Sequence, residues 1–127
     1  MKRYEKNAAA IGLTRAAALA CTPEKSGQVT ETHLEDGSLR LDYTVAVRPW
    51  FSGVLKRLGV GADGRIEKKL QLDELGTQVW KLVDNRKTVR EIVREFARLH
   101  QLMEKEAEVA VTRFLRELGK RGLIGLR

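Results

Sequence analysis

Apolar and polar residues alternate along two stretches of the chain, residues 39–47 and residues 65–72. Alternation with period two is typical of a strand with one buried face and one solvated face. Asp36-Gly37 precedes the first stretch, and Asp-Gly favours a hairpin turn because that turn needs positive φ. We therefore predict a hairpin over residues 28–48, whose first strand spans about 29–34, and a third strand over 65–72. Lys68 interrupts the apolar side of the third strand, which predicts an edge position.

From Asp73 onward the apolar period changes to 3.6, which predicts three helices. They span about 73–84, 88–100 and 104–121; Thr88 and Glu91 form a capping box, and Gly122 ends the last helix. Trp80 is assigned to the core. The apolar stripes predicted to be buried comprise Leu75, Val79, Leu82 and Val83; Val89, Ile92, Val93, Phe96 and Leu99; and Ala107, Ala110, Val111, Phe114, Leu115 and Leu118. The predicted fold is α+β and winged-helix-like, a three-stranded antiparallel sheet followed by three helices (βββααα).

The length of 127 residues suits one domain with a tail. Residues 1–27 are expected to be a flexible N-terminal tail, since Pro23 and Ser26-Gly27 mark a linker at its end. Residues 28–127 form the predicted domain, with an insertion at about 49–64 that carries Trp50 and Phe51. The sequence leaves open whether this insertion covers the core, docks an enzyme or a second copy, or touches a membrane surface.

Candidate catalytic residues are sparse: the chain has two histidines and one cysteine, with no metal-ligand spacing. We expect a protein that is not an enzyme and binds no cofactor or metal. The single Cys21 excludes an internal disulfide, and no stretch is apolar for long enough to span a bilayer. A cytoplasmic protein without membrane contact is therefore expected.

The net charge of +7 favours an acidic partner, either nucleic acid or a peptide. The N-terminal half of the third predicted helix carries Glu104, Glu106 and Glu108, which would repel a phosphate backbone. We therefore expect no nucleic-acid partner, and a winged-helix DNA-binding transcriptional regulator is the alternative.

A second stripe on this helix is mixed apolar and basic, and the edge of the third strand offers unpaired backbone groups to an extended peptide. The predicted groove would have a strand wall and a helix wall. These walls comprise Ile66, Lys68 and Leu70 on the strand, and Val109, Thr112, Arg113 and Arg116 on the helix.

Three segments resemble the PqqD family. Residues 72–80 (LDELGTQVW) are similar to its first-helix signature, 87–93 (KTVREIV) to the start of its second helix, and 114–118 (FLREL) with 122–124 (GLI) to its ending. The chain departs from the family at Asp84-Asn85, where Asp-Gly is frequent, at Met103, which is no ordinary helix cap, and in the 49–64 insertion.

This resemblance implies a peptide-binding chaperone, a RiPP recognition element for ribosomally made and modified peptides. It implies that the leader of a precursor peptide adds to the third strand and lies against the third helix. The partner would be a modifying enzyme, often a radical S-adenosylmethionine (SAM) enzyme. Leaders in the family are often acidic, which would suit Lys68, Arg113 and Arg116. The precursor, the modification and the choice between monomer and homodimer stay open.

Overall fold

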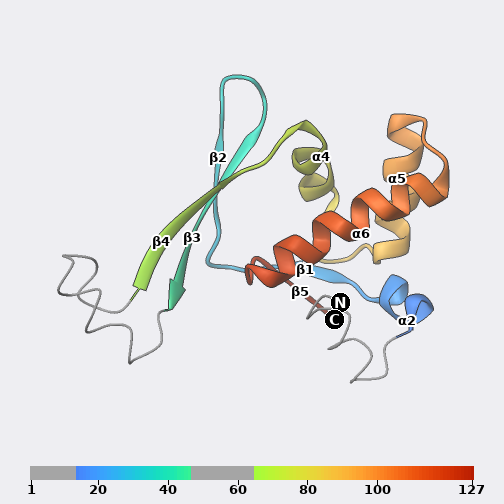
Figure 1. Cartoon of the computed structure of the whole chain (residues 1–127), viewed down its shortest axis with the longest axis horizontal. Helices are drawn as coiled ribbons and strands as arrows, with labels where there is room; N and C mark the ends of the chain where they lie inside the picture. The colour runs from blue at the N-terminus through green and yellow to red at the C-terminus, as the bar shows by residue number, and fades with distance from the viewer. Residues whose placement is uncertain (1–13, 47–64) are drawn as a thin grey trace. The chain divides into compact units, whose positions relative to one another are not determined.

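The computed structural model describes residues 14–46 and 65–127 (Figure 1). The described residues 28–46 and 65–73 form one compact unit, here called the sheet unit. Residues 74–127 together with residues 14–27, here called the N-terminal segment, form the other, here called the helical unit. The predicted insertion at 49–64, with Trp50 and Phe51, lies outside the described residues.

The sheet unit is a three-stranded antiparallel sheet with the order β2-β3-β4. Its strands are β2 (Thr30–His33), β3 (Leu39–Ala46) and β4 (Arg65–Gln71). The predicted hairpin is confirmed: Gly37 adopts a φ of 87° and its amide donates to the Leu34 carbonyl at 3.0 Å. The Asp36 carboxylate accepts the Ser38 amide at 3.0 Å, which fixes the turn. β4 pairs with β3 alone within the described part of the chain and lies at an edge of the sheet, as Lys68 predicted.

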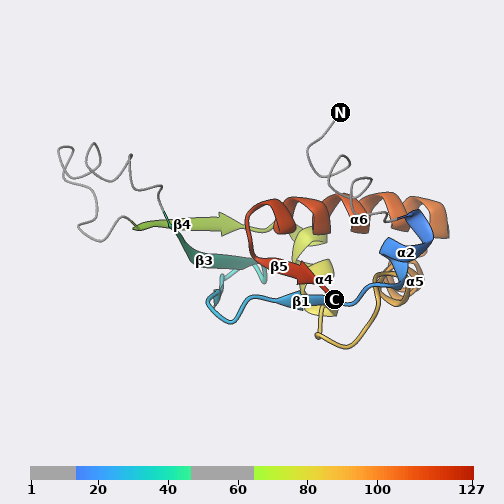
Figure 2. The ribbon, with the colours of Figure 1, turned by 90° about the horizontal axis from the view of Figure 1, so that it is seen from below.

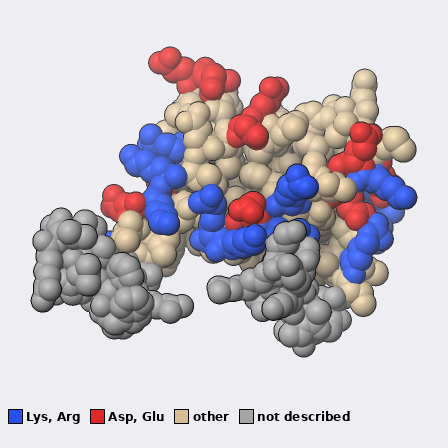
Figure 3. All heavy atoms as spheres, in the orientation of Figure 1, with Lys and Arg blue, Asp and Glu red and all other residues tan. Residues whose placement is uncertain are grey.

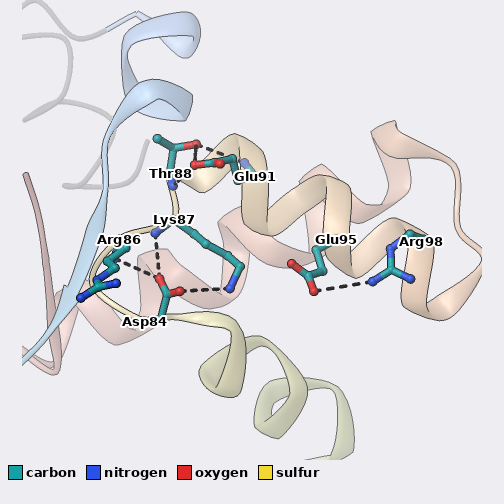
Figure 4. Close-up of polar contacts among 7 residues, drawn as sticks. All are labelled: Asp84, Arg86, Lys87, Thr88, Glu91, Glu95 and Arg98. Carbon is teal, nitrogen blue, oxygen red and sulfur yellow. Dashed lines mark hydrogen bonds and ion pairs between the residues drawn. The ribbon is translucent and has the colours of Figure 1, made fainter.

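The helical unit contains α4 (Glu74–Leu82), α5 (Val89–His100) and α6 (Glu104–Lys120), so the three predicted helices are confirmed. Figure 4 shows how α5 begins: the Thr88 hydroxyl accepts the Glu91 amide at 3.2 Å, and the Glu91 carboxylate accepts the Thr88 amide at 2.9 Å. Asn85 has a φ of 65° in the α4–α5 connection, and Gly122 has a φ of 76° after α6. Both positions therefore have the left-handed conformation that their residue types favour.

Asp84 organises the connection between α4 and α5 (Figure 4). Its carboxylate accepts the backbone amides of Lys87 at 2.7 Å and Arg86 at 2.9 Å, and the Lys87 ammonium at 3.0 Å. These donors hold the pKa of the Asp84 carboxyl well below its ordinary value. The carboxylate thus stabilises the tight turn that leads into the capping box.

The core of the helical unit matches the predicted stripes at most positions and departs from them at two helix ends and at Phe114. Trp80 is 1% exposed and confirms its assignment. Leu75 and Leu99, by contrast, are 50% and 48% exposed, so their predicted burial is wrong. Leu75 lies in the first turn of α4 and Leu99 in the last turn of α5, so both are at the ends of their stripes. Phe114 is partly exposed, because the buried residues of α6 form a narrower stripe than predicted. That stripe comprises Ala107, Val111, Leu115 and Leu118.

The N-terminal segment corrects the prediction of a flexible tail for residues 14–27. Residues Arg15–Ala20 form α2, with Thr14 as its cap, and Leu19 is 3% exposed. Residues Pro23–Lys25 form β1, which pairs antiparallel with β5 (Ile124–Leu126), as Figures 1 and 2 both show. Such short elements carry no periodicity, so their order depends on distant partners that the local pattern does not display.

Three further contacts attach this segment to the rest of the helical unit. The Val89 amide, at the start of α5, donates to the Cys21 carbonyl at 2.8 Å. Thr22 and Arg127 exchange two backbone hydrogen bonds of 2.9 Å each. The Lys25 ammonium lies 4.5 Å from the centre of the buried Trp80 ring. Within the residues described, no helix is both long and apolar enough to cross a membrane.

Candidate peptide-binding site

The hydrogen bonds of the sheet determine which residues of β4 direct their backbone amides and carbonyls away from β3. The Leu72 amide donates to the Leu39 carbonyl at 2.8 Å, and the β3–β4 register continues the same antiparallel pairing. Hydrogen-bonded and non-hydrogen-bonded pairs alternate along such a ladder. Ile66, Lys68 and Leu70 therefore direct their amides and carbonyls toward β3. The intervening Glu67, Lys69 and Gln71 direct theirs toward the outer edge, which pairs with no strand among the described residues.

The β2–β3 ladder supports this assignment independently. The Leu34 amide donates to the Ser38 carbonyl at 2.9 Å, and the register places Thr32 opposite Arg40. By alternation, the even-numbered residues of β3 bond toward β2, which leaves the odd-numbered ones for β4. Both ladders thus assign the same backbone groups of β3 to β4.

The strand wall predicted from the sequence lies on one face of the sheet. Ile66, Lys68 and Leu70 lie opposite Val45, Tyr43 and Leu41 of β3, respectively. Directly opposed residues share a face, and on this face Leu41 is fully buried and Tyr43 is 7% exposed. Ile66 and Leu70 are partly exposed, whereas Lys68 is exposed. The wall is therefore an apolar strip at the sheet edge with a cation at its centre.

The helix wall lies on the surface of α6. Val109 is 57% exposed, Arg113 is exposed, and Thr112 and Arg116 are partly exposed. The Thr112 hydroxyl donates to the Glu108 carbonyl at 2.6 Å, so its proton is already used within the helix. In Figure 3, Lys and Arg side chains gather over the C-terminal half of α6, with a carboxylate among them. This face offers a mixed apolar and cationic surface.

Sequence reasoning missed one contact beside this wall. The Arg15 guanidinium of α2 binds the Glu108 carboxylate, with a distance of 2.8 Å between Nε and Oε2. This hydrogen bond and the positive charge hold the pKa of the Glu108 carboxyl below its ordinary value. The two residues are 93 positions apart, so no local pattern pointed to the pair. It compensates a negative charge next to Val109.

The strand wall belongs to the sheet unit and the helix wall belongs to the helical unit. Each set of predicted residues shares one surface of its own element. In the described parts of the chain, no group of three or more His, Cys, Asp or Glu residues could hold a metal ion. The Cys21 thiol contacts the Ala17 carbonyl at 3.3 Å, and the His100 ring lies 4.4 Å from that of Phe96.

The family model described as coenzyme PQQ synthesis protein D (PqqD) matches residues 64–124 of this chain. The resemblance to the PqqD family is confirmed. The PqqD match spans β4 and all three predicted helices, and so includes every residue of both walls. No protein of curated function matches the sequence.

A solved structure, TbiB1 in complex with the TbiA(beta) leader peptide, is similar to this chain with a TM-score of 0.54. The two sequences are 21% identical, and the match covers 80% of this chain and 93% of that one. At this identity the likeness concerns the fold. It confirms the predicted α+β class, in which a three-stranded antiparallel sheet precedes three helices, while α2, β1 and β5 extend the predicted order.

Proposed function

We propose that this protein is a non-catalytic adaptor that binds the leader of a ribosomally made precursor peptide and presents it to a modifying enzyme. The observation that carries the proposal is the outer edge of β4, which no described strand covers and toward which Glu67, Lys69 and Gln71 direct their backbone groups. An extended peptide adds to such an edge as another strand. The PqqD match and the likeness to a structure solved with a leader peptide support this choice of ligand.

The bound leader pairs with β4 through backbone hydrogen bonds and contacts α6 with its side chains. Ile66, Lys68 and Leu70 contribute the strand wall. The residues proposed to contribute the helix wall are Val109, Thr112, Arg113 and Arg116. The positive net charge of the chain and the cations on both walls favour an acidic leader.

Such an adaptor contributes to the reaction by delivering the precursor peptide to the modifying enzyme. Holding the leader raises the effective concentration of the attached core peptide at the active site of the enzyme. The adaptor itself needs no cofactor, and its proposed partner is a modifying enzyme of the radical SAM class. We propose that the protein acts in the cytoplasm, as a monomer or a homodimer.

Amide-shift NMR tests this function. The labelled full chain is titrated with a synthetic acidic leader from a precursor encoded beside its gene, and with a scrambled peptide of the same composition. Saturable shifts at residues 65–72 and 109–120, absent with the scrambled peptide, are expected. A leader that leaves both segments unshifted would contradict the proposal. Shifts of Arg113 to Arg121 induced by duplex DNA instead would identify a DNA-binding regulator.

A further inference from the structure

We propose that Lys68 determines which leaders the protein accepts. It selects a peptide with an acidic residue that is flanked, two positions away on each side, by apolar residues. This inference rests on the proposed function, because it requires a strand that adds to β4. It adds a sequence motif for the ligand and one residue that reads it.

The placement of Lys68 within β4 suggests this role. Ile66 and Leu70 lie two positions away on either side, on the same face of the sheet, and both are partly exposed. Lys68 is exposed and makes no ion pair with any residue of the described segments. Directly opposite on β3 lies Tyr43, which has no carboxylate to pair with the ammonium group. The ammonium group therefore stands within an apolar strip, with no described carboxylate to compensate it.

Hydrogen-bonded and non-hydrogen-bonded positions alternate along β4, and this alternation brings the side chains of Ile66, Lys68 and Leu70 closest to an incoming strand. The outward backbone groups come from Glu67, Lys69 and Gln71, so these three form the hydrogen-bonded pairs with an antiparallel peptide. Peptide residues opposite Ile66, Lys68 and Leu70 then occupy non-hydrogen-bonded pairs. In such pairs the Cα atoms approach to about 4.5 Å and the side chains lie closer together. Side-chain selection is therefore strongest along this strip.

Charge and polarity then specify the three peptide positions. A residue opposite Lys68 is favoured when acidic and disfavoured when basic, because directly opposed charges interact across strands. Its neighbours two positions away share its face and lie opposite Leu70 and Ile66, where apolar side chains bury surface. The expected motif is thus apolar, any residue, Asp or Glu, any residue, apolar.

Lys81 provides the matched control. It is also an exposed lysine, but it lies on α4, outside both walls. Charge reversal at either position changes the net charge equally and removes no buried group. Only Lys68 lies on the strip that reads the proposed motif.

The test selects short random-sequence peptides from a displayed library against the full-length protein and against Lys68→Glu and Lys81→Glu. The wild type and Lys81→Glu are expected to enrich the motif with Asp or Glu at its centre. Lys68→Glu is expected to enrich Lys or Arg there and to keep the apolar flanks. Identical central residues for the wild type and Lys68→Glu would overturn the inference.

Two synthetic peptides that carry the motif, one with Glu and one with Lys at the centre, give the magnitude. The wild type is expected to prefer the Glu peptide by about fivefold, and Lys68→Glu to reverse this preference. Circular dichroism checks that both variants stay folded. If the wild type binds the peptides at β4 without preference, the inference fails and the proposed function stands. If the wild type enriches no peptide and shows no β4 shifts, the proposed function fails with it.

Discussion

The carboxylate of Glu108 on α6 is bound by the guanidinium group of Arg15 on α2, and Val109, the first residue of the proposed helix wall, follows it directly. The N-terminal segment lies outside the residues that match the PqqD family model. Its Arg15 nevertheless neutralises part of the Glu108 charge beside the proposed site. Without Arg15, the Glu108 carboxylate would lose its hydrogen-bonded cation, and this part of α6 would present more negative charge to an acidic ligand.

Arg15→Ala is accordingly expected to weaken the binding of an acidic leader about two- to threefold, since exposed charge pairs contribute little. Adding Glu108→Gln to Arg15→Ala is expected to restore the affinity, because it removes the same negative charge. Peptide titrations at low salt measure both effects. Equal affinities for wild type and Arg15→Ala would show that this pair has no influence on the site.

The cations of the helix wall lead to a second prediction. Arg113→Glu combined with Arg116→Glu is expected to weaken acidic-leader binding more than tenfold, because two attractive contacts become repulsive. The control is Lys81→Glu combined with Arg86→Glu, which changes the net charge equally at exposed positions outside both walls. Calorimetric titration compares the two double variants, with thermal unfolding as a check of the fold. Similar losses for both would attribute the effect to net charge alone.

A pair of leucines tests whether the N-terminal segment is part of the folded helical unit. Leu19→Ala removes a side chain that is 3% exposed and is expected to cost about 2–5 kcal/mol of unfolding free energy. Leu75→Ala makes the same chemical change at a side chain that is 50% exposed, and a cost below about 1 kcal/mol is expected. Urea unfolding followed by circular dichroism measures both. A negligible cost for Leu19→Ala would support the flexible tail predicted from the sequence.

The two phenylalanines of the helical unit are expected to differ in the same way. Phe96 is fully buried, so Phe96→Ala should cost about 3–5 kcal/mol. Phe114 is only partly buried, so Phe114→Ala should cost less, although the sequence alone predicted a full core position. Unfolding free energies from denaturant titration rank the two. A larger cost at position 114 would show that its side chain fills a core site.

Asp84 is expected to make stability depend on pH in the acid range. Its pKa is lowered in the folded state, chiefly by the Lys87 amide, so its contribution is fully present above the unfolded pKa of about 4. The contribution is lost progressively as the pH falls below that value toward the folded pKa. Asp84→Asn is therefore expected to be less stable than the wild type at pH 7, and the difference should shrink by pH 2. Thermal unfolding across this range measures it, and a constant difference would contradict the assignment.

The elements that the sequence predicted well are those whose signals are local. The Asp36-Gly37 turn and the Thr88–Glu91 capping box each depend on residues a few positions apart, and both are confirmed. Lys68, on an otherwise apolar face, predicted the edge position of β4, which the strand order confirms. By contrast, the order of residues 15–25 depends on β5 and α5, which lie far along the chain. No pattern within the segment encodes those partners.

The features of the candidate site also differ in whether they depend on local or on distant residues. Alternation on the strand and helical spacing on α6 predicted which residues share each wall, and their contact with a peptide stays a prediction. The compensation of Glu108 by Arg15 was not predicted, since it joins residues 93 positions apart. The boundary of the buried stripe at Phe114 also escaped prediction, because it depends on how the neighbouring elements cover α6 rather than on its own period.

The pairing of β1 with β5 also has a kinetic consequence. Glu24 of β1 and Arg127, which directly follows β5, form an ion pair and are 103 residues apart. Closing so long a loop costs entropy before any contact offsets it, and contacts of high sequence separation slow folding. On a translating ribosome, β1 is made early but has no partner until the final described strand emerges. We therefore expect the helices to assemble first and the two-stranded β1–β5 ribbon to close last.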